Sequence, residues 1–205
     1  EPLFVLCTED GNSSGEGLSR AGGGLRRAGN SPVDRSAPIL LVYLRPGDRR
    51  PSPDLSRGIL TVFIINAACA LALSGVIWVV QVCHYPLFSL IDPPSFIRYE
   101  KAHQAKISYV VIPLMIAELA ASLMLVVLTP SFLRPAAAWL NFSLVAIVWL
   151  STFLIQVPCH RRLSAGFDGR AHGLLVRSNW IRTFSWSAKS VFNLYLIFGL
   201  LERYE

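Results

Sequence analysis

The sequence predicts an all-α integral membrane protein: a bundle of four transmembrane helices preceded by an extended, irregular N-terminal arm. Four long apolar stretches lie within residues 59–201, and a helix that crosses the hydrocarbon layer needs about 20 apolar residues. The composition agrees, because 53% hydrophobic and 16% charged residues are unusual for a soluble chain of this length. We therefore expect two parts, the arm over residues 1–57 and the membrane domain over residues 58–205.

The arm, residues 1–57, has too little apolar surface to build a core of its own. It is rich in Gly, Pro and Ser, as in Gly22-Gly23-Gly24 and Pro51-Ser52-Pro53, and this composition favours irregular structure. Two short apolar runs, residues 3–6 and 39–44, interrupt it. We expect these runs to contact other membrane subunits, with Phe4, Leu6, Ile39, Leu41 and Tyr43 as the partner-binding residues.

The four spans are expected at residues 59–83, 107–128, 135–159 and 183–201. The first and third contain no charge, the second contains only Glu118, and the fourth contains only Lys189. None alternates with a period of two residues, as a strand of a membrane β-barrel would. An even number of spans places the N- and C-termini on the same side of the membrane and the longer links, 85–106 and 161–182, on the other.

The first and third spans end in similar sequences, Gln81-Val82-Cys83-His84 and Gln156-Val157-Pro158-Cys159-His160. This similarity predicts an internal duplication. Two helical hairpins of like orientation would then be related by an axis along the membrane normal. All four histidines of the chain fall at the same end of such a bundle.

Polar groups inside a span are costly and need partners. Glu118 lies roughly 16 Å into the second span at the usual helical rise, so we expect it to be protonated or paired. Lys189 is the preferred partner, and Gln81, Gln156 and Asn193 complete a predicted intramembrane polar cluster. A proton relay or a metal site is the functional alternative for the same residues.

The histidines, with the nearby carboxylate, form a candidate site for a metal, a haem or a (bacterio)chlorophyll, because neutral imidazole is a ligand of all three. The candidate ligands are His84, His103, Glu118 and His160. Neither His-x-x-x-His nor Cys-x-x-Cys occurs, and histidine at a membrane interface is often only an amphipathic side chain. The sequence therefore leaves the cofactor open, including the case of none.

Aromatic and basic residues meet at the start of the fourth span, where Trp180, Arg182 and Trp186 are expected to anchor the helix at the interface. The same group could hold an anionic lipid head group or a quinone. The net charge of +6 is explained by arginines beside the spans facing anionic lipid. Lipids and membrane subunits, and not nucleic acid, are therefore the expected partners.

Residues 59–201 contain a characteristic series of polar, aromatic and proline residues. In chain order they are Trp78, Gln81, His84-Tyr85-Pro86, Tyr99, His103, Pro113, Glu118, Gln156-Val157-Pro158, His160 and Asn179-Trp180-Ile181-Arg182-Thr183. This series resembles small four-span bacterial membrane proteins of unknown function and, more distantly, is similar to the anthrone-oxygenase-like group. The resemblance implies a bacterial inner membrane protein and transfers no catalytic motif to particular residues.

Two functions follow from this sequence. The first is a non-catalytic accessory subunit of a large bacterial bioenergetic complex, either a photosynthetic reaction-centre and light-harvesting complex or a respiratory complex. Its spans and arm would stabilise assembly, and the chain would not be an enzyme. The alternative is a small membrane oxidoreductase that binds a metal or haem through the clustered histidines. The arm with its two apolar runs favours the first.

Overall fold

The computed structural model describes residues 53–130 and 132–202. The expected arm, apart from its last residues, lies outside this range. The expected anchors Phe4, Leu6, Ile39, Leu41 and Tyr43 lie outside it too, so their partners stay a prediction.

The described residues form helices joined by short connections. In chain order the elements are α2 (Pro53–Val79), the π-helix η1 (Val80–His84), the 3₁₀-helix η2 (Pro86–Leu90), α3 (Pro93–Leu128), α4 (Pro135–Ser151), the π-helix η3 (Thr152–Gln156), α5 (Val157–Leu163) and α6 (Gly169–Leu201).

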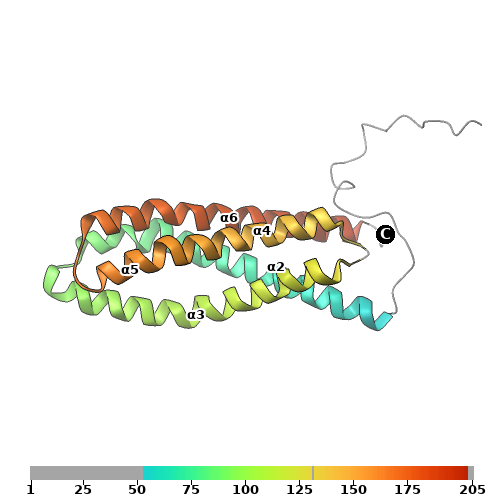
Figure 1. The fold of residues 1–205 in the computed structure, drawn as a ribbon, viewed down its shortest axis with the longest axis horizontal. Helices are drawn as coiled ribbons and strands as arrows, with labels where there is room; N and C mark the ends of the chain where they lie inside the picture. The colour runs from blue at the N-terminus through green and yellow to red at the C-terminus, as the bar shows by residue number, and fades with distance from the viewer. Residues whose placement is uncertain (1–52, 131, 203–205) are drawn as a thin grey trace, which may run out of the picture. The chain divides into compact units, whose positions relative to one another are not determined.

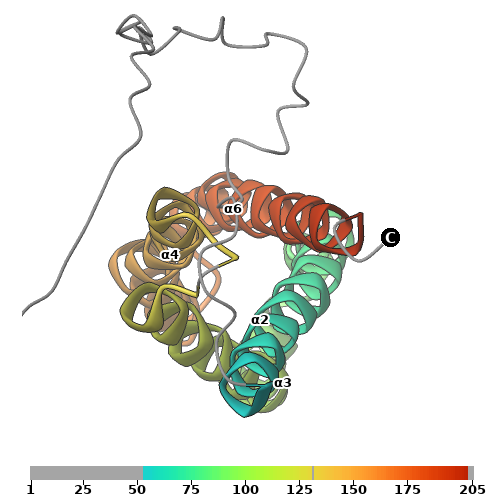
Figure 2. The ribbon, with the colours of Figure 1, turned by 90° about the vertical axis from the view of Figure 1, so that its right-hand side faces the viewer.

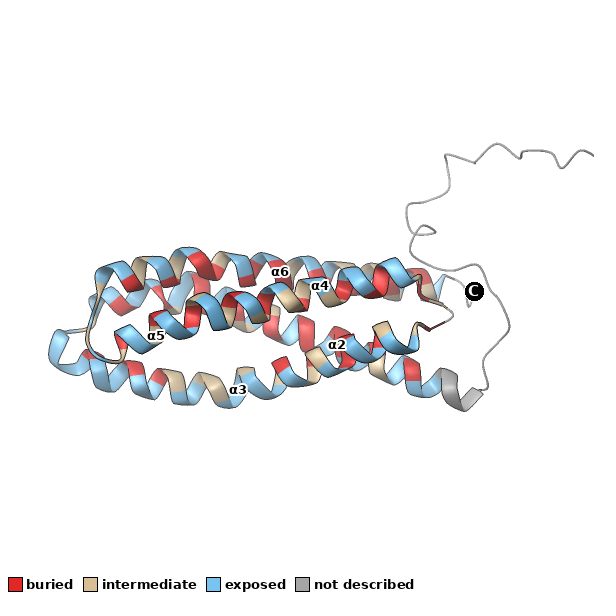
Figure 3. Ribbon diagram, viewed as in Figure 1, coloured by how far each residue is buried: buried red, intermediate tan, exposed pale blue. Residues whose placement is uncertain are grey.

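Four helical stretches are long and apolar enough to cross a membrane: Arg57–Leu90, Pro93–Leu128, Pro135–Leu163 and Gly169–Leu201. Burial is inverted relative to a soluble protein, because leucine, isoleucine, valine and phenylalanine side chains cover much of the exposed surface while many polar side chains are buried. Figure 3 marks the buried, intermediate and exposed residues along each helix. Glu118, Lys189 and Asn193 are fully buried. A bilayer requires this distribution, and the predicted four-helix membrane fold is confirmed.

The helices run up and down around a common axis. α2 packs against α3 and α6, and α4 packs against the same two helices (Figures 1 and 2). The hairpins α2–α3 and α4–α6 have the same orientation, as the repeat predicted. The start of α2 and the end of α6 consequently lie at one end of the bundle (Figure 1).

Each half of the bundle contains one π-helical turn, and each turn ends two residues before a proline, Pro86 or Pro158. Proline lacks an N–H and its ring collides with the carbonyl four residues earlier, so a continuous α-helix is disfavoured at this point. The wider turn is visible in the bond from the Tyr85 N–H to the Val80 carbonyl, 2.9 Å. One extra residue in the turn rotates the following side chains by about 100°. Tyr85 and His160 both follow such a turn.

Two helices begin much earlier than the apolar runs suggested. α3 begins at Pro93 and α6 at Gly169, so most of the expected links 85–106 and 161–182 is helix. The charges in these segments interrupt an apolar run but do not oppose helix formation. Both starts are capped, since the Asp92 carboxylate accepts from the Ser95 N–H, 3.0 Å, and Asp168 caps α6.

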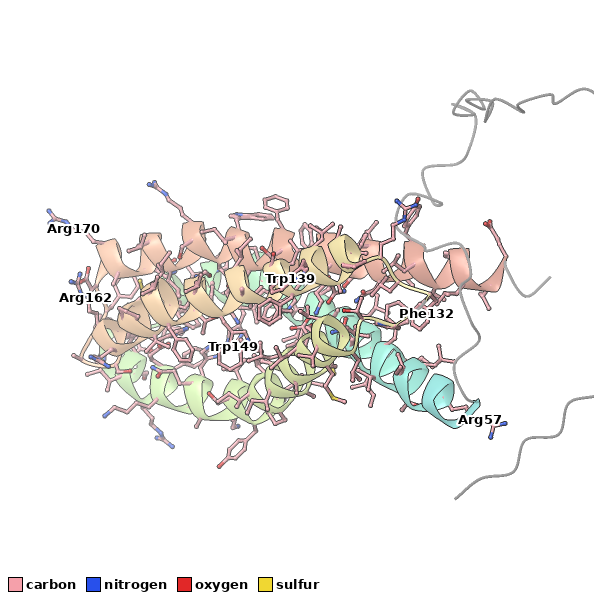
Figure 4. All side chains as sticks on the ribbon, turned by 45° about the vertical axis from the view of Figure 1, so that its right-hand side comes forward. Arg57, Phe132, Trp139, Trp149, Arg162 and Arg170 are labelled. Atoms are coloured by element: carbon pink, nitrogen blue, oxygen red, sulfur yellow. The ribbon has the colours of Figure 1, made fainter. Side chains whose placement is uncertain are left out.

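The interior consists of two apolar clusters separated by polar side chains. One cluster, at the histidine end, surrounds Phe88, Phe96, Leu175 and Trp186. The other surrounds Phe63, Leu125, Leu133 and Leu196. Charged side chains mark the two ends of the bundle, with Arg57 at one end and Arg162 and Arg170 at the other, where the histidines lie (Figure 4).

The cap of α6 is expected to make stability depend on acidity. The backbone N–H groups of Ala171 and Arg170 donate to the Asp168 carboxylate and hold its pKa below the usual value. A depressed pKa stabilises the fold at pH values above the ordinary aspartate pKa of about 3.9, and the gain is lost as the pH falls through the lower, folded-state pKa.

Asp168→Ala should therefore lower the melting temperature at pH 7, and the difference from wild type should shrink on acidification. Thermal melts in detergent from pH 7 to pH 3 would show this; a difference independent of pH would contradict it. Asp168→Asn, which keeps a capping oxygen, is the control.

Candidate functional site

The histidines gather at one end of the bundle. The rings of His84 and His103 are 4.4 Å apart between centroids, and those of His103 and His160 are 5.9 Å apart. His172 lies at the same end, where its Nε2 is 2.8 Å from the Tyr85 carbonyl oxygen. The prediction of a shared histidine end is confirmed.

A hydrogen-bonded chain joins Glu100, His160 and Tyr85, which come from α3, α5 and the connection after η1. His160 Nδ1 lies 2.6 Å from Glu100 Oε1, and the Tyr85 hydroxyl lies 3.1 Å from His160 Nε2. Glu100 is fully buried and Tyr85 is nearly so. Gln104 donates to the same carboxylate oxygen, 3.0 Å, and to Ser164 Oγ, 2.6 Å. We call the Glu100–His160–Tyr85 chain the relay.

A second chain faces the α2–α3 side. His84 Nε2 is 2.8 Å from His103 Nδ1 and 3.3 Å from the Tyr99 hydroxyl. An apolar groove of about 640 Å³ between α2 and α3 is lined by His84, His103, Tyr99 and Lys106, among others. Within the described residues, His103 Nε2 and Glu100 Oε2 are buried without a hydrogen-bond partner.

The imidazoles bond to one another, to a carboxylate and to tyrosines, and do not converge on a point. Within residues 53–130 and 132–202, no group of three or more His, Cys, Asp or Glu side chains has an arrangement that could hold a metal ion. A metal, haem or chlorophyll ligated by His84, His103 or His160 stays a prediction.

The relay opens on a cavity of about 370 Å³ inside the bundle. Its polar wall contains Tyr85, Gln104, His160 and Arg182, and most of the remaining wall is apolar. Such a cavity, apolar with a few convergent polar groups, is the usual form of a small-molecule site. Its apolar lining includes Leu73, Val76, Ile77, Ile107, Val111, Met115, Trp149, Phe153 and Trp186.

Two of the three expected interfacial anchors are inside the bundle, which corrects that prediction. Arg182 is 7% exposed and Trp186 is 1% exposed, and the Arg182 guanidinium lies 5.0 Å from the centre of the Trp186 ring. The long α6 explains the difference, because it begins at Gly169 and so places Arg182 roughly 20 Å along the helix. Trp180 is half-buried and packs edge-on against Trp78, 5.6 Å between centroids.

The predicted contact between Glu118 and Lys189 is confirmed. Lys189 Nζ lies 2.9 Å from Glu118 Oε1, and the Trp186 indole N–H donates to the other oxygen, 3.0 Å. Lys189 also donates to Ser122, 3.0 Å. Ser122 begins a closed ring of side-chain hydrogen bonds with one residue from each of α3, α4, α6 and α2: Ser122, Asn141, Asn193 and Asn66.

The two glutamines of the repeat are not part of this cluster. Gln81 accepts from Asn179 Nδ2, 2.8 Å, and Gln156 donates to Ser178 Oγ, 3.2 Å. Both therefore contact neighbouring residues of α6 and lie at similar depth, as predicted. The expected single cluster of Gln81, Glu118, Gln156, Lys189 and Asn193 is thus divided between two levels of the bundle.

The carboxylate expected beside the histidines was misassigned. Glu118 lies roughly 22 Å along α3 from His103 and is occupied by Lys189. Glu100 takes the place beside the histidines. Its sequence signal, which we did not recognise in the sequence, is the Glu-x-x-His spacing of Glu100 and His103, which puts both side chains on one face of a helix. The role of Tyr85 depends on the π turn and had no separate signal.

Comparison with known proteins gives no further guide: no protein-family model, curated protein or solved structure matches this chain.

Proposed function

We propose that this chain is a small membrane enzyme that moves a proton to or from a lipid-soluble substrate held in the bundle cavity. The observation that carries the proposal is the relay, whose residues Tyr85 and His160 both line the cavity.

The relay has the connectivity that acid–base catalysis needs. A carboxylate only accepts, so the 2.6 Å contact places a proton on His160 Nδ1 and leaves Nε2 to accept from the Tyr85 hydroxyl. When His160 takes that proton, Glu100 stabilises the imidazolium that forms. Hydrolase triads have the same arrangement: a hydroxyl group, an imidazole that takes the hydroxyl proton, and a carboxylate that orients the imidazole. Arg182 lies near enough to the Tyr85 hydroxyl to interact with it and would stabilise a tyrosinate.

The cavity indicates where the substrate comes from. Ile112 on α3, Phe153 in η3 and Val157 in α5 line the cavity and are also exposed on the outer surface of the bundle. In a membrane this surface faces acyl chains. A substrate dissolved in the bilayer would therefore enter between α3 and the α4–α5 segment without passing through water.

This proposal belongs with the oxidoreductase alternative, because removal of a proton from a phenol or an activated C–H group prepares such a substrate for oxidation. The resemblance to the anthrone-oxygenase-like group supports the same kind of substrate. The accessory-subunit function depends on the arm and stays a prediction.

Exchange of the acidic ring CH₂ hydrogens of anthrone in deuterated buffer under nitrogen tests proton transfer without any oxidation. The purified protein in lipid nanodiscs should accelerate the exchange measured by NMR. Tyr85→Phe, which keeps the ring and removes the hydroxyl, should lower the catalysed rate by about 10²- to 10⁴-fold, the usual contribution of a positioned acid or base.

Tyr99→Phe is the matched control, because Tyr99 also bonds a histidine, His84, but does not line the cavity. It should keep the wild-type rate. An equal loss in both variants, or an undiminished rate in Tyr85→Phe, would refute the assignment of Tyr85.

A further inference from the structure

Arg182 is a buried cation whose partners are neutral. The side chain is 7% exposed, Nη1 donates to the Asn179 amide oxygen, 3.3 Å, and the guanidinium lies over the Trp186 ring, 5.0 Å from its centre. No carboxylate of the described residues forms an ion pair with it, since the two ion pairs found there are Glu100–His160 and Glu118–Lys189.

The guanidinium cannot lose its charge to escape this environment, because arginine stays protonated in proteins. A buried charge without a counter-ion is costly. The neutral groups near the guanidinium offset only part of this cost, because Nε of Arg182 is buried and has no hydrogen-bond partner. These groups are the Asn179 amide oxygen, the Tyr85 hydroxyl and the face of the Trp186 indole.

A second side chain that lines the cavity also carries a donor without a partner. The indole nitrogen Nε1 of Trp149, on α4, is buried without a partner, and Trp149 and Arg182 both line the 370 Å³ cavity. Two donors without acceptors, one of them cationic, fit a ligand that brings negatively charged oxygen. The apolar remainder of the wall fits a hydrophobic body.

We propose that the cavity binds a lipid-soluble organic anion, with its carboxylate or phenolate oxygens on Arg182 and its apolar body against Trp149, Phe153 and Trp186. This deepens the proposed function, on which it rests for the role of the ligand as a substrate. A planar guanidinium matches a carboxylate through two parallel hydrogen bonds, and the aromatic wall favours a ring system over a flexible chain. The same guanidinium would hold the anion that proton removal leaves next to Tyr85.

Binding of 2-naphthoate to the full chain in lipid nanodiscs tests this directly, with naphthalene-2-methanol as the uncharged probe of the same shape. Equilibrium dialysis against empty nanodiscs corrects for partition into lipid. Wild type should bind the anion at least about tenfold more tightly than the alcohol, a factor that corresponds to one charge-assisted hydrogen bond. Oleate in a third arm distinguishes a ring-shaped anion from a fatty acid, and tighter binding of oleate would overturn the aromatic assignment.

Arg182→Gln should remove the preference for 2-naphthoate over the alcohol, and Arg182→Lys should keep part of it. Arg177→Gln, an exposed arginine on the same helix, is the matched control and should bind as wild type does. Equal binding of both probes by wild type overturns the proposal even if no Arg182 variant folds. Undiminished anion preference in a folded Arg182→Gln protein overturns it too.

The two proposals fail in different ways. If the Tyr85→Phe protein binds 2-naphthoate normally and the exchange of anthrone hydrogens is unaffected by Tyr85, the anion site stands and the acid–base function falls. If exchange depends on Tyr85 but wild type has no anion preference, the acid–base function stands and the anion site is refuted.

Discussion

Replacing Glu118 by alanine is expected to cost about 3–5 kcal/mol of bundle stability, because it leaves the buried ammonium of Lys189 without its counter-ion. Both side chains of the pair are at most 1% exposed. The same substitution removes the acceptor of the Trp186 indole N–H. Reversible unfolding in mixed micelles of increasing dodecyl sulfate content, followed by circular dichroism, would measure the loss.

The double variant Glu118→Leu with Lys189→Met separates the charge from the packing. Replacing both partners by apolar groups of similar size is often nearly neutral, so the double variant should be more stable than Glu118→Ala. Lys101→Ala, an exposed lysine on the same helix, serves as control. A loss for Glu118→Ala below about 1 kcal/mol, the value of an exposed pair, would show that the contact does not hold the bundle together.

The central pair was predictable from sequence because membrane spans make polar residues conspicuous. Glu118 and Lys189 were the single charges in their apolar runs, and a lone charge in a span requires a partner. The neutral members of the same network, Asn66, Ser122 and Asn141, were not predicted. A serine or an asparagine in a span is common, and its partner depends on how the helices are rotated about their axes.

The histidine end was harder to predict because helix length and helix phase both matter there. The apolar runs placed the starts of the second and fourth spans too late, so His103, Glu100 and Arg182 were read as parts of links or interfaces. The structure places all three in helices, with their side chains turned inward. The two π turns then shift the phase of Tyr85 and His160, and a regular helical period cannot anticipate such a shift.

The relay combines residues from both features of the fold, the long α3 and the segments after the two π turns. Glu100 comes from the unexpectedly long α3, while Tyr85 and His160 come from segments that follow the π turns. The repeat of Gln81-Val82-Cys83-His84 in the second half therefore does more than duplicate a span. It places a proline-associated π turn in each hairpin, and the side chains after the two turns meet through the Tyr85–His160 contact.

Glu100→Gln and His160→Gln are each expected to lower the proton-exchange rate by about 10²- to 10⁴-fold, because each breaks the relay at a different bond. Residues that act as one unit give strongly non-additive losses. The double variant should therefore be hardly slower than the slower single variant. The exchange rates of anthrone hydrogens, measured by NMR for wild type, both single variants and the double variant, would give the interaction free energy between the two positions.

His84→Gln is the control that decides between a relay and a metal or haem site. His84 contacts His103 and Tyr99 but neither Glu100 nor the cavity, so the relay predicts an almost unchanged rate. A site that needs several imidazole ligands predicts the opposite, a loss as large as that of His160→Gln. Additive losses at Glu100 and His160, together with a large loss at His84, would replace the relay by the histidine-ligated cofactor that the sequence first suggested.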